Sequence, residues 1–365
     1  QAYAIRAYAH FQLLSYYTTD YTDDSALGVI AVDFVPTIDQ QLLRNTNGEV
    51  YALIESDLNQ AQNLIADKSN PLYISRDFVK ALRARMAAYR QNYTLAEELA
   101  SQLVQDYPLA NRDQYEAMFL DEDNTEVIFK LERTLNDSYD GQGSTGSVAA
   151  GGWAGARFAF TNGTIGGGVY YEFDRGLFNL FDPDDIRYDV CLTDDSVVSS
   201  DYDNAENYLE DDILVIGKYP GSEGQNLMND LKVFRSSEMQ LIIAEARIAD
   251  NRLNGTTNSA ASAIKALRDA RFGEDTALPN YANQTVAFNA LLNERRVEFA
   301  FEGHRWKDIK RLGERANQGA QREPLDCAFT GACSLAPDDF RFTLPLPIVE
   351  FNGNPGLREQ QNPGY

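Results

Sequence analysis

The chain has 365 residues, 44% of them hydrophobic, and a formal net charge of −23 at pH 7. This length can bury a sizeable core, as one large domain or as two smaller ones. The acidic excess argues against nucleic acid as a partner, because phosphate binding needs a basic face, and it disfavours an anionic membrane surface. No run of about 18 apolar residues predicts a transmembrane helix, and residues 1–6 lack a signal-peptide pattern.

The first part of the chain is predicted to be helical. Apolar residues already recur at helical spacing from Ile5 to Leu13. A second helix is expected after residues 46–49 (Thr-Asn-Gly-Glu), which are typical of a capping box. Both segments therefore belong to a helical scaffold.

A helical hairpin is predicted next. Ser75 is expected to cap a helix that ends near Asn92, and residues 94–97 (Thr-Leu-Ala-Glu) look like the capping box of its partner. That second helix should stop before Pro108. Residues 75–107 thus have the tetratricopeptide length of roughly 34 residues.

The middle of the chain has a different composition. Residues 126–132 (Glu-Val-Ile-Phe-Lys-Leu-Glu) are typical of a short strand. Glycine makes up about a third of residues 141–171, and residues 194–212 are rich in aspartate. Because a long irregular region within a domain is usually functional or disordered, we expect residues 133–232 to form loops that carry the binding site.

Helical patterns return in the C-terminal half. Ser236 or Ser237 is expected to cap one helix, and residues 257–271 should form its partner. A third pattern runs over residues 285–312, with Gly313 as its stop. The prolines of the last 21 residues predict an extended tail that wraps on the helices.

The predicted fold class is therefore mainly α. We expect a single domain with a tetratricopeptide-type helical-repeat scaffold and a loop-rich middle region that contains a short strand. The scaffold covers about residues 1–20, 47–118 and 236–313, and the loop region about residues 133–232.

The three cysteines are expected to have two different roles. Cys327 and Cys333 lie close together in a loop-like stretch and predict a small disulfide-closed loop, which would imply an oxidising compartment. Two free thiols are the alternative, since the spacing does not match a zinc site and no histidine lies nearby. Cys191 is predicted to be a buried, inert thiol.

Motifs for catalysis, metals and cofactors are weak. Residues 141–146 match G-x-G-x-x-G but lack the strand and helix that a dinucleotide site needs. The only histidines, His10 and His304, lie among aromatic residues and are expected to pack. Residues 201–206 lack the glycine of a calcium loop. We expect no cofactor, no metal and no catalysis, although paired carboxylates leave glycoside hydrolysis open.

Aromatic residues of the loop region favour a sugar ligand. Sugars have weakly apolar flat faces and a rim of hydroxyl groups, which suit aromatic rings flanked by polar side chains. The alternative is that these aromatic residues fix the loops to the core. The predicted glycan-binding residues are Trp153, Tyr170, Tyr171, Tyr202 and Tyr208, and Tyr219 lies in the same region.

Short stretches along the whole chain form one further pattern. They are residues 1–13 (QAYAIRAYAHFQL), 27–29 (LGV), 126–129 (EVIF), 177–187 (LFNLFDPDDIR), 234–246 (FRSSEMQLIIAEA), 293–296 (NERR), 301–311 (FEGHRWKDIKR), 346–348 (LPI) and 361–365 (QNPGY). Together and in this order, they resemble the SusD/RagB family, the outer-membrane glycan-binding lipoproteins of Bacteroidetes.

The resemblance implies a function and a partner. It implies tetratricopeptide-type helices, no catalysis, a glycan site on surface loops, and a SusC-like TonB-dependent transporter beneath the protein. It also implies a surface-exposed lipoprotein of the outer membrane. Members of the family begin with a lipoprotein signal, a lipidated cysteine and further helices, so we expect this chain to lack an N-terminal portion on the order of a hundred residues. Membrane attachment through that anchor is inferred from the family alone.

The resemblance also separates structural from ligand-binding residues. The sugar-binding aromatic residues of the family lie in variable loops, so no motif identifies them here. Charged residues inside the helical motifs are expected to be paired and packed. These motif residues are Arg235, Glu245, Glu294, Arg305, Trp306 and Asp308.

The alternatives to a glycan-binding protein are a tetratricopeptide adaptor for proteins and a glycoside hydrolase. The glycan is expected to be a β-glucan such as laminarin, because the acidic surface suits a saline habitat. An α-glucan or a host-type glycan stays open.

Overall fold

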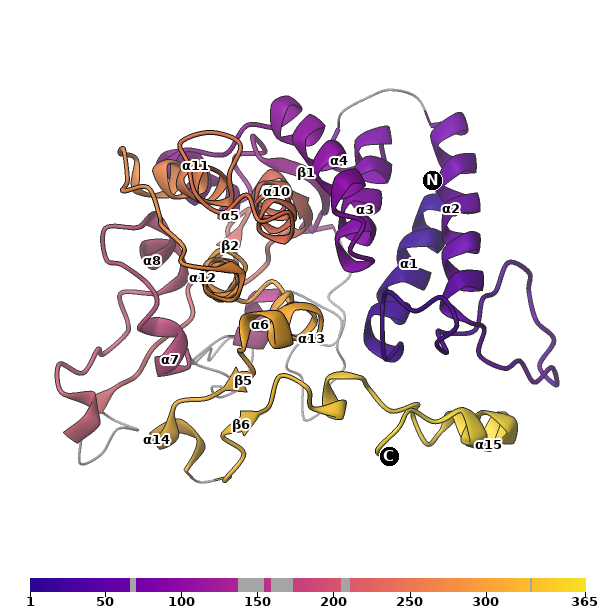
Figure 1. The fold of residues 1–365 in the computed structure, drawn as a ribbon. Helices are drawn as coiled ribbons and strands as arrows, with labels where there is room; N and C mark the ends of the chain where they lie inside the picture. The colour runs from indigo at the N-terminus through magenta and orange to yellow at the C-terminus, as the bar shows by residue number, and fades with distance from the viewer. Residues whose placement is uncertain (66–69, 137–153, 159–172, 205–210, 329) are drawn as a thin grey trace.

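The computed structural model describes residues 1–65, 70–136, 154–158, 173–204, 211–328 and 330–365 (Figure 1). The fold is mainly helical, as predicted, and the scaffold consists of long helices at both ends of the chain. They are α1 (Ala2–Tyr17), α2 (Asn47–Leu64), α3 (Arg76–Tyr89), α4 (Tyr93–Asp106), α10 (Ser236–Ala249), α11 (Ala260–Phe272), α12 (Gln284–Glu298) and α13 (Arg305–Ala316).

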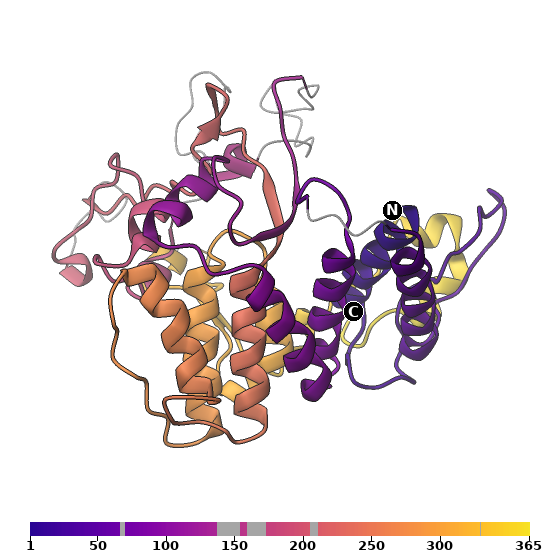
Figure 2. The same ribbon diagram turned by 90° about the horizontal axis from the view of Figure 1, so that it is seen from above.

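The long helices pack as consecutive pairs. α1 lies against α2, α3 against α4, α10 against α11, and α12 against α13. The two halves of the scaffold join where α4 packs against α10, although about 130 residues separate them. Figure 2 shows α10, α11 and α12 side by side. Fully buried alanines such as Ala84, Ala96 and Ala100 allow these close helix contacts.

Two predicted helix caps agree with the structure. The capping box of α2 is present, with Thr46 accepting from the Glu49 amide, and Ser75 accepts from the Phe78 amide at the start of α3. α4 instead begins at Tyr93, because Asn92 is its N-cap and accepts from the Leu95 amide. The capping box predicted at residues 94–97 is therefore wrong, since these residues already lie inside the helix.

The predicted cap of α10 and the predicted start of α11 also differ from the structure. α10 follows Arg235 directly and has no side-chain cap. The Ser237 hydroxyl instead accepts a hydrogen bond from the Arg235 guanidinium at 2.7 Å. α11 begins three residues later than predicted, with Ser259 as its N-cap, and ends at Gly273 in a left-handed conformation with φ of 72°.

The long helix predicted over residues 285–312 is two helices. α12 ends at Glu298 and α13 begins at Arg305. Between them the chain turns through Phe301 and Gly303, whose φ angles are 64° and 79°. Gly313 does not end α13, which continues to Ala316. A Cβ at Gly313 would lie 2.8 Å from the Gln318 carbonyl oxygen, so the glycine permits this close approach.

The predicted strand is present and closes the loop region. β1 (Val127–Leu131) pairs antiparallel with β4 (Leu231–Arg235). The chain therefore leaves the scaffold after β1 and returns to it about 100 residues later at β4. The shorter strand pairs are β2 (Gly221–Ser222) with β3 (Gln225–Asn226) and β5 (Ala320–Gln321) with β6 (Ser334–Leu335).

Short helices connect these parts. In the first half and the loop region they are α5 (Arg112–Phe119), α6 (Ala154–Phe158), α7 (Arg175–Phe178), α8 (Ile186–Cys191) and the 3-10 helix η1 (Tyr202–Asn204). The C-terminal segment contains α14 (Pro324–Cys327), η2 (Phe340–Phe342), α15 (Glu350–Gly353) and η3 (Pro355–Gln360).

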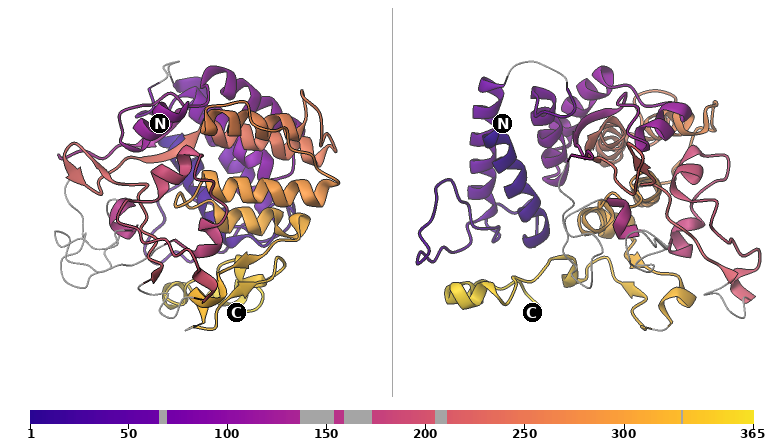
Figure 3. Two further views of the ribbon diagram at one scale, coloured as in Figure 1. Left: turned by 90° about the vertical axis from the view of Figure 1, so that its left-hand side faces the viewer. Right: turned by 180° about the vertical axis from the view of Figure 1, so that it is seen from behind.

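The C-terminal tail crosses the molecule. It runs beside the helices to the end where α1 and α2 lie (Figure 3). Arg44 holds the tail there by donating to the Gln360 carbonyl oxygen at 2.7 Å and to Asn362 Oδ1 at 2.9 Å. The predicted wrapped tail is thus present, with short helices within it.

A buried ion network joins the strands to the helices. Arg271 of α11 contacts Glu126 at 2.9 Å and Glu298 at 2.8 Å, and Arg235 at the end of β4 pairs with both carboxylates as well. All four side chains are at most 2% exposed. Arg235 also contacts Glu302 at 2.8 Å. The reversal between α12 and α13 places Glu302 at this position.

The motif residues expected to be structural have partners within the protein. Glu245 pairs with Arg311 at 2.5 Å, Glu294 with Arg187 at 2.7 Å, and Asp308 with Arg295 at 2.7 Å. Arg305 donates to the Leu292 carbonyl oxygen and Trp306 to the Phe342 carbonyl oxygen. The six residues named in advance, Arg235 included, are thus packed or paired.

Removing one charge of the network should be costly. We expect Glu298→Gln to lower the free energy of unfolding by about 3–5 kcal/mol, because it leaves Arg235 and Arg271 buried without a full counter-charge. Urea unfolding followed by circular dichroism measures this. The control is Glu55→Gln, whose partly exposed pair with Arg83 should change stability by less than about 1 kcal/mol. Equal effects of both variants would contradict the central role of the network.

The network should also make the fold sensitive to acid. Burial by itself raises the pKa of Glu302, but Arg235 and Lys218 outweigh it and lower the pKa below its ordinary value of 4.5. The folded protein therefore binds fewer protons than the unfolded chain as the pH falls through this range. Stability is fully present above about pH 4.5 and is lost below it.

We expect Glu302→Gln to be less stable at pH 7 but to lose less stability between pH 5 and pH 3 than the unmodified protein, because the amide does not titrate. Urea unfolding across this pH range measures the difference. A steeper acid loss in the variant would be inconsistent with a lowered pKa at Glu302.

Candidate functional site

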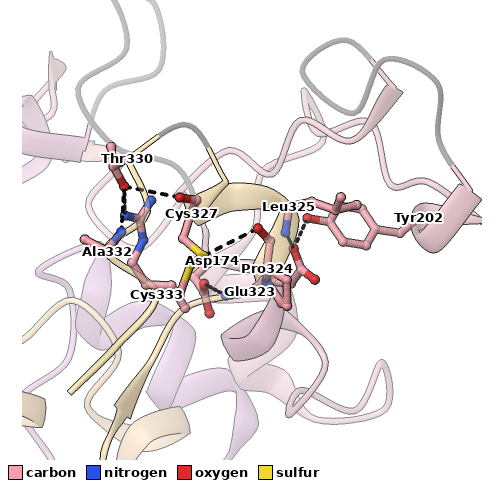
Figure 4. The surroundings of a disulfide bond; sticks show 10 residues. Asp174, Tyr202, Glu323, Pro324, Leu325, Cys327, Thr330, Ala332 and Cys333 are labelled. Atoms are coloured by element: carbon pink, nitrogen blue, oxygen red, sulfur yellow. Dashed lines mark hydrogen bonds between the residues drawn. A yellow bond between two sulfur atoms is a disulfide. The ribbon is translucent and has the colours of Figure 1, made fainter. Parts of the chain in front are cut away.

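The loop region meets the C-terminal segment at one corner of the molecule (Figure 4). Asp174 is the N-cap of α7 and accepts from the Leu177 amide. Its carboxylate also accepts from the Glu323 amide at 2.9 Å and from Arg296 of α12 at 3.0 Å. One aspartate thus connects a loop-region helix, the scaffold and the segment that leads into α14. We call this the Tyr202 corner, after the aromatic residue that it holds.

Tyr202 is fixed by polar contacts on two sides. Its hydroxyl donates to Glu323 Oε2 at 2.6 Å (Figure 4). The guanidinium carbon of Arg175 lies 5.0 Å from the centre of its ring, and Arg175 is held in turn by Asp212 at 2.7 Å. Tyr202 is only 7% exposed. In this structure its ring therefore supports the corner, and little of its face meets solvent.

The predicted disulfide is present beside this corner. Cys327, at the end of α14, is bonded to Cys333, just before β6 (Figure 4). The Cys327 carbonyl oxygen accepts from the Gly331 amide at 2.9 Å, which closes the small loop. Cys191 is a buried free thiol as predicted, and burial raises its pKa to about 11. A thiol with that pKa stays protonated and unreactive at neutral pH.

Four of the five predicted glycan-binding residues, Trp153, Tyr170, Tyr171 and Tyr208, lie outside the described residues. Their role stays a prediction. Tyr219, by contrast, is 6% exposed and donates to the Phe301 carbonyl oxygen at 3.1 Å. It fixes the loop region to the core, which is the alternative that its sequence position left open.

A small pocket opens in the loop region at a place that the sequence did not indicate. Its volume is about 230 Å³, and its walls include Phe119, Leu192, Thr193, Lys218 and Pro220. The Thr193 hydroxyl is buried and has no hydrogen-bond partner among the described residues. The volume is below the range of about 300–1,000 Å³ typical of drug-sized ligands, so the pocket has room for a small group only. No local motif marks it, because its walls come from segments about 100 residues apart.

Several described carboxyl groups have pKa values displaced in the direction opposite to that of a glycosidase acid. A general acid in such an enzyme needs a raised pKa. Wherever the pKa of a described carboxyl group is displaced, it is lowered. At Asp308 and Glu298, for example, burial would raise the pKa, but neighbouring arginines outweigh it.

The described residues also give no metal site and no membrane-crossing helix. No group of three or more His, Cys, Asp or Glu side chains is placed to hold a metal ion in the described parts of the chain. His304 stacks on Phe299 with ring centres 4.4 Å apart, and burial lowers its pKa well below the ordinary value. His10 accepts from the Val32 amide, so both histidines pack as expected. None of the described helices is long and apolar enough to cross a membrane.

Comparisons with known proteins identify the family. A model of the SusD family matches residues 217–365, and a model described as starch-binding and associating with the outer membrane matches residues 1–90. The chain belongs to the SusD/RagB family. Its tetratricopeptide-type helices are thus those of the SusD fold.

Curated members of the SusD/RagB family include two similar proteins of Formosa agariphila. SusD-like protein P2 is 25% identical over 413 aligned residues, which cover 100% of this chain and 73% of that protein. SusD-like protein P38 is 23% identical and covers 86% of this chain, matching 66% of its own length.

Solved structures share the SusD fold. A SusD superfamily protein from Bacteroides thetaiotaomicron has a TM-score of 0.76 at 21% identity, covering 99% of this chain and 77% of that one. Surface glycan-binding protein A from Bacteroides fluxus has a TM-score of 0.68 at 20% identity, covering 100% of this chain and 77% of that one.

Thiol labelling should separate the three cysteines. We expect no reaction with a thiol reagent in the native protein at pH 8, one reactive thiol after unfolding, and three after unfolding with reductant. Mass spectrometry of the labelled protein counts them. Cys191→Ser should show none after unfolding without reductant. Three reactive thiols without reductant would mean that Cys327 and Cys333 are not bonded.

Proposed function

We propose that this protein is a non-catalytic glycan-binding protein of the bacterial cell surface. The observation that carries the proposal is the membership of the SusD/RagB family, with family models matching both ends of the chain. One protein of the same fold, from Bacteroides fluxus, is named a surface glycan-binding protein. The glycan itself binds, in this proposal, to the loop region over residues 133–232.

The geometry of the loop region supports the proposal. Loops can present ligand-binding side chains only if a rigid base holds their ends. Here β1 and β4 hold both ends of the region together, and the Tyr202 corner attaches its middle to α12 and α14. Trp153, Tyr170, Tyr171 and Tyr208 are the proposed stacking residues. Tyr202, which is 7% exposed, is proposed to act beside the ligand by fixing the loop that carries it.

Binding without cleavage is consistent with the electrostatics. Arginines neutralise the buried carboxylates of Glu126, Glu294 and Glu298, so these groups serve the fold. Neighbouring basic groups lower the pKa of Glu298, Glu302 and Asp308, which is opposite to the raised pKa of a general acid. In this proposal the bound glycan is handed on intact.

The proposed recipient is a SusC-like TonB-dependent transporter, for which the protein acts as a lid. Location at the outer membrane, through a lipid anchor, belongs to the same proposal. One of the two matching family models describes association with the outer membrane. The proposed glycan is a β-glucan such as laminarin, since an acidic surface with a net charge of −23 suits a saline habitat.

Electrophoresis in native gels that contain a polysaccharide tests the proposal. We expect laminarin to retard the protein, with no release of reducing ends during prolonged incubation. Release of reducing ends would instead show a glycoside hydrolase. If laminarin, starch and host-type glycans all leave the migration unchanged, the proposal is wrong and the alternative of a protein-binding tetratricopeptide adaptor is favoured.

The stacking role of Trp153 gives a sharper prediction. We expect Trp153→Ala to weaken glycan binding at least tenfold, about 1.4 kcal/mol or more, with nearly unchanged thermal stability. Calorimetric titration with laminarin oligosaccharides measures this. The matched control is Tyr73→Ala, which removes an aromatic residue that is 58% exposed outside the loop region and should leave binding unchanged. A large fall in melting temperature for Trp153→Ala would make it a core residue.

A further inference from the structure

A further cleft among the described residues lies away from the Tyr202 corner. Its volume is about 490 Å³, and it opens between residues 180–187, the end of α11 with the segment that follows it, and α12. We call it the helix cleft. It shares no wall residue with the Tyr202 corner or with the small pocket beside Phe119. Its volume falls within the range of about 300–1,000 Å³ that is usual for sites of small organic ligands.

Arg268 supplies hydrogen-bond donors to the helix cleft. Its Nε donates to Glu294 Oε2 at 2.8 Å, and its side chain is 36% exposed. Among the residues that the structure describes, none accepts from the two terminal nitrogens of this guanidinium. The other oxygen of Glu294 is held by the buried Arg187 at 2.7 Å. The guanidinium is therefore anchored at one side and open at the other, as a ligand-binding arginine must be.

Part of the wall of the cleft is apolar. This part is formed by Leu180, Phe272 and Val297. The apolar side chain of Leu180 is 37% exposed. Phe272 is half-buried at the end of α11, so part of its ring meets the cleft. An apolar wall together with a few fixed polar groups suits a ligand that has a flat C–H face and a polar rim.

The charges of the cleft select against anionic ligands. Five carboxylates line it, from Asp182, Asp185, Glu274, Asp275 and Glu294, against the two guanidinium groups. This excess of negative charge repels anions, and the described side chains form no metal-binding group. A hydroxyl group is neutral, donates to carboxylates and accepts from a guanidinium. A ligand with many hydroxyl groups can therefore satisfy both kinds of wall residue at once.

We propose that the helix cleft is a second binding site, for a short stretch of a neutral oligosaccharide. The inference rests on the proposed function, because it assigns a further site for the same class of ligand. Two sites on one rigid chain would bind a polysaccharide more tightly than either alone, since the second contact is intramolecular. Arg268 would hold the sugar hydroxyls, and Phe272 and Leu180 would meet the sugar face.

Stoichiometry tests the second site without disturbing an ion pair. Ala277 is exposed and lines the cleft, so Ala277→Trp should fill it. The matched control is Ala266→Trp, at an exposed position of α11 that does not line the cleft. The probes are laminaripentaose and, as the α-linked alternative, maltopentaose, counted per chain by native mass spectrometry and titrated by calorimetry.

We expect two bound oligosaccharides per chain for the unmodified protein and for Ala266→Trp, and one for Ala277→Trp. Arg268→Lys keeps a positive charge beside Glu294 but loses the terminal nitrogens, and it should weaken the second site at least tenfold. Trp153→Ala should retain binding at the helix cleft and lose it at the loops.

Other outcomes separate this inference from the proposed function. If one oligosaccharide binds per chain, and Trp153→Ala abolishes this binding while Ala277→Trp does not, the second site is wrong and the proposed function stands. If one oligosaccharide binds per chain, and Ala277→Trp abolishes this binding while Trp153→Ala does not, the helix cleft is the binding site and the proposed loop site is wrong. Absence of binding for both probes would overturn both.

Discussion

The fold depends on the buried contact of Arg235 and Arg271 with Glu126 and Glu298. These four side chains come from the start of β1, the end of β4, α11 and α12, so one network ties the strand pair to the C-terminal helices. Charges buried this deeply are tolerable only because each carboxylate meets two guanidinium groups. These charges thus serve to hold the strand pair and the helices together.

The central network also positions the loop region. The loop region leaves and re-enters the scaffold at β1 and β4, directly beside the network. Its middle is attached again where Asp174 connects α7 to Arg296 and to the segment before α14. Loops fixed at both ends and in the middle can vary in sequence without loss of the fold.

Local sequence patterns were reliable where the physics is local. The caps at Thr46 and Ser75, the strand at residues 127–131 and the bond between Cys327 and Cys333 agree with the structure. The errors arose where a pattern continued through a change of conformation. Residues 285–312 keep helical spacing, but the left-handed conformations of Phe301 and Gly303 reverse the chain. At α10, Ser237 resembled a cap but accepts from a buried arginine instead.

The sequence by itself determined the helical scaffold, the caps, the disulfide pair and the family resemblance, because these depend on residues within a few turns of one another. Only the tertiary structure decided which charges meet. Glu126 and Arg235 are 109 residues apart, and their contact follows from the pairing of β1 with β4. It likewise decided that Tyr219 belongs to the core and that Arg268 opens into a cleft. Burial and cleft walls are set by segments that are distant in sequence, so no local pattern carries them.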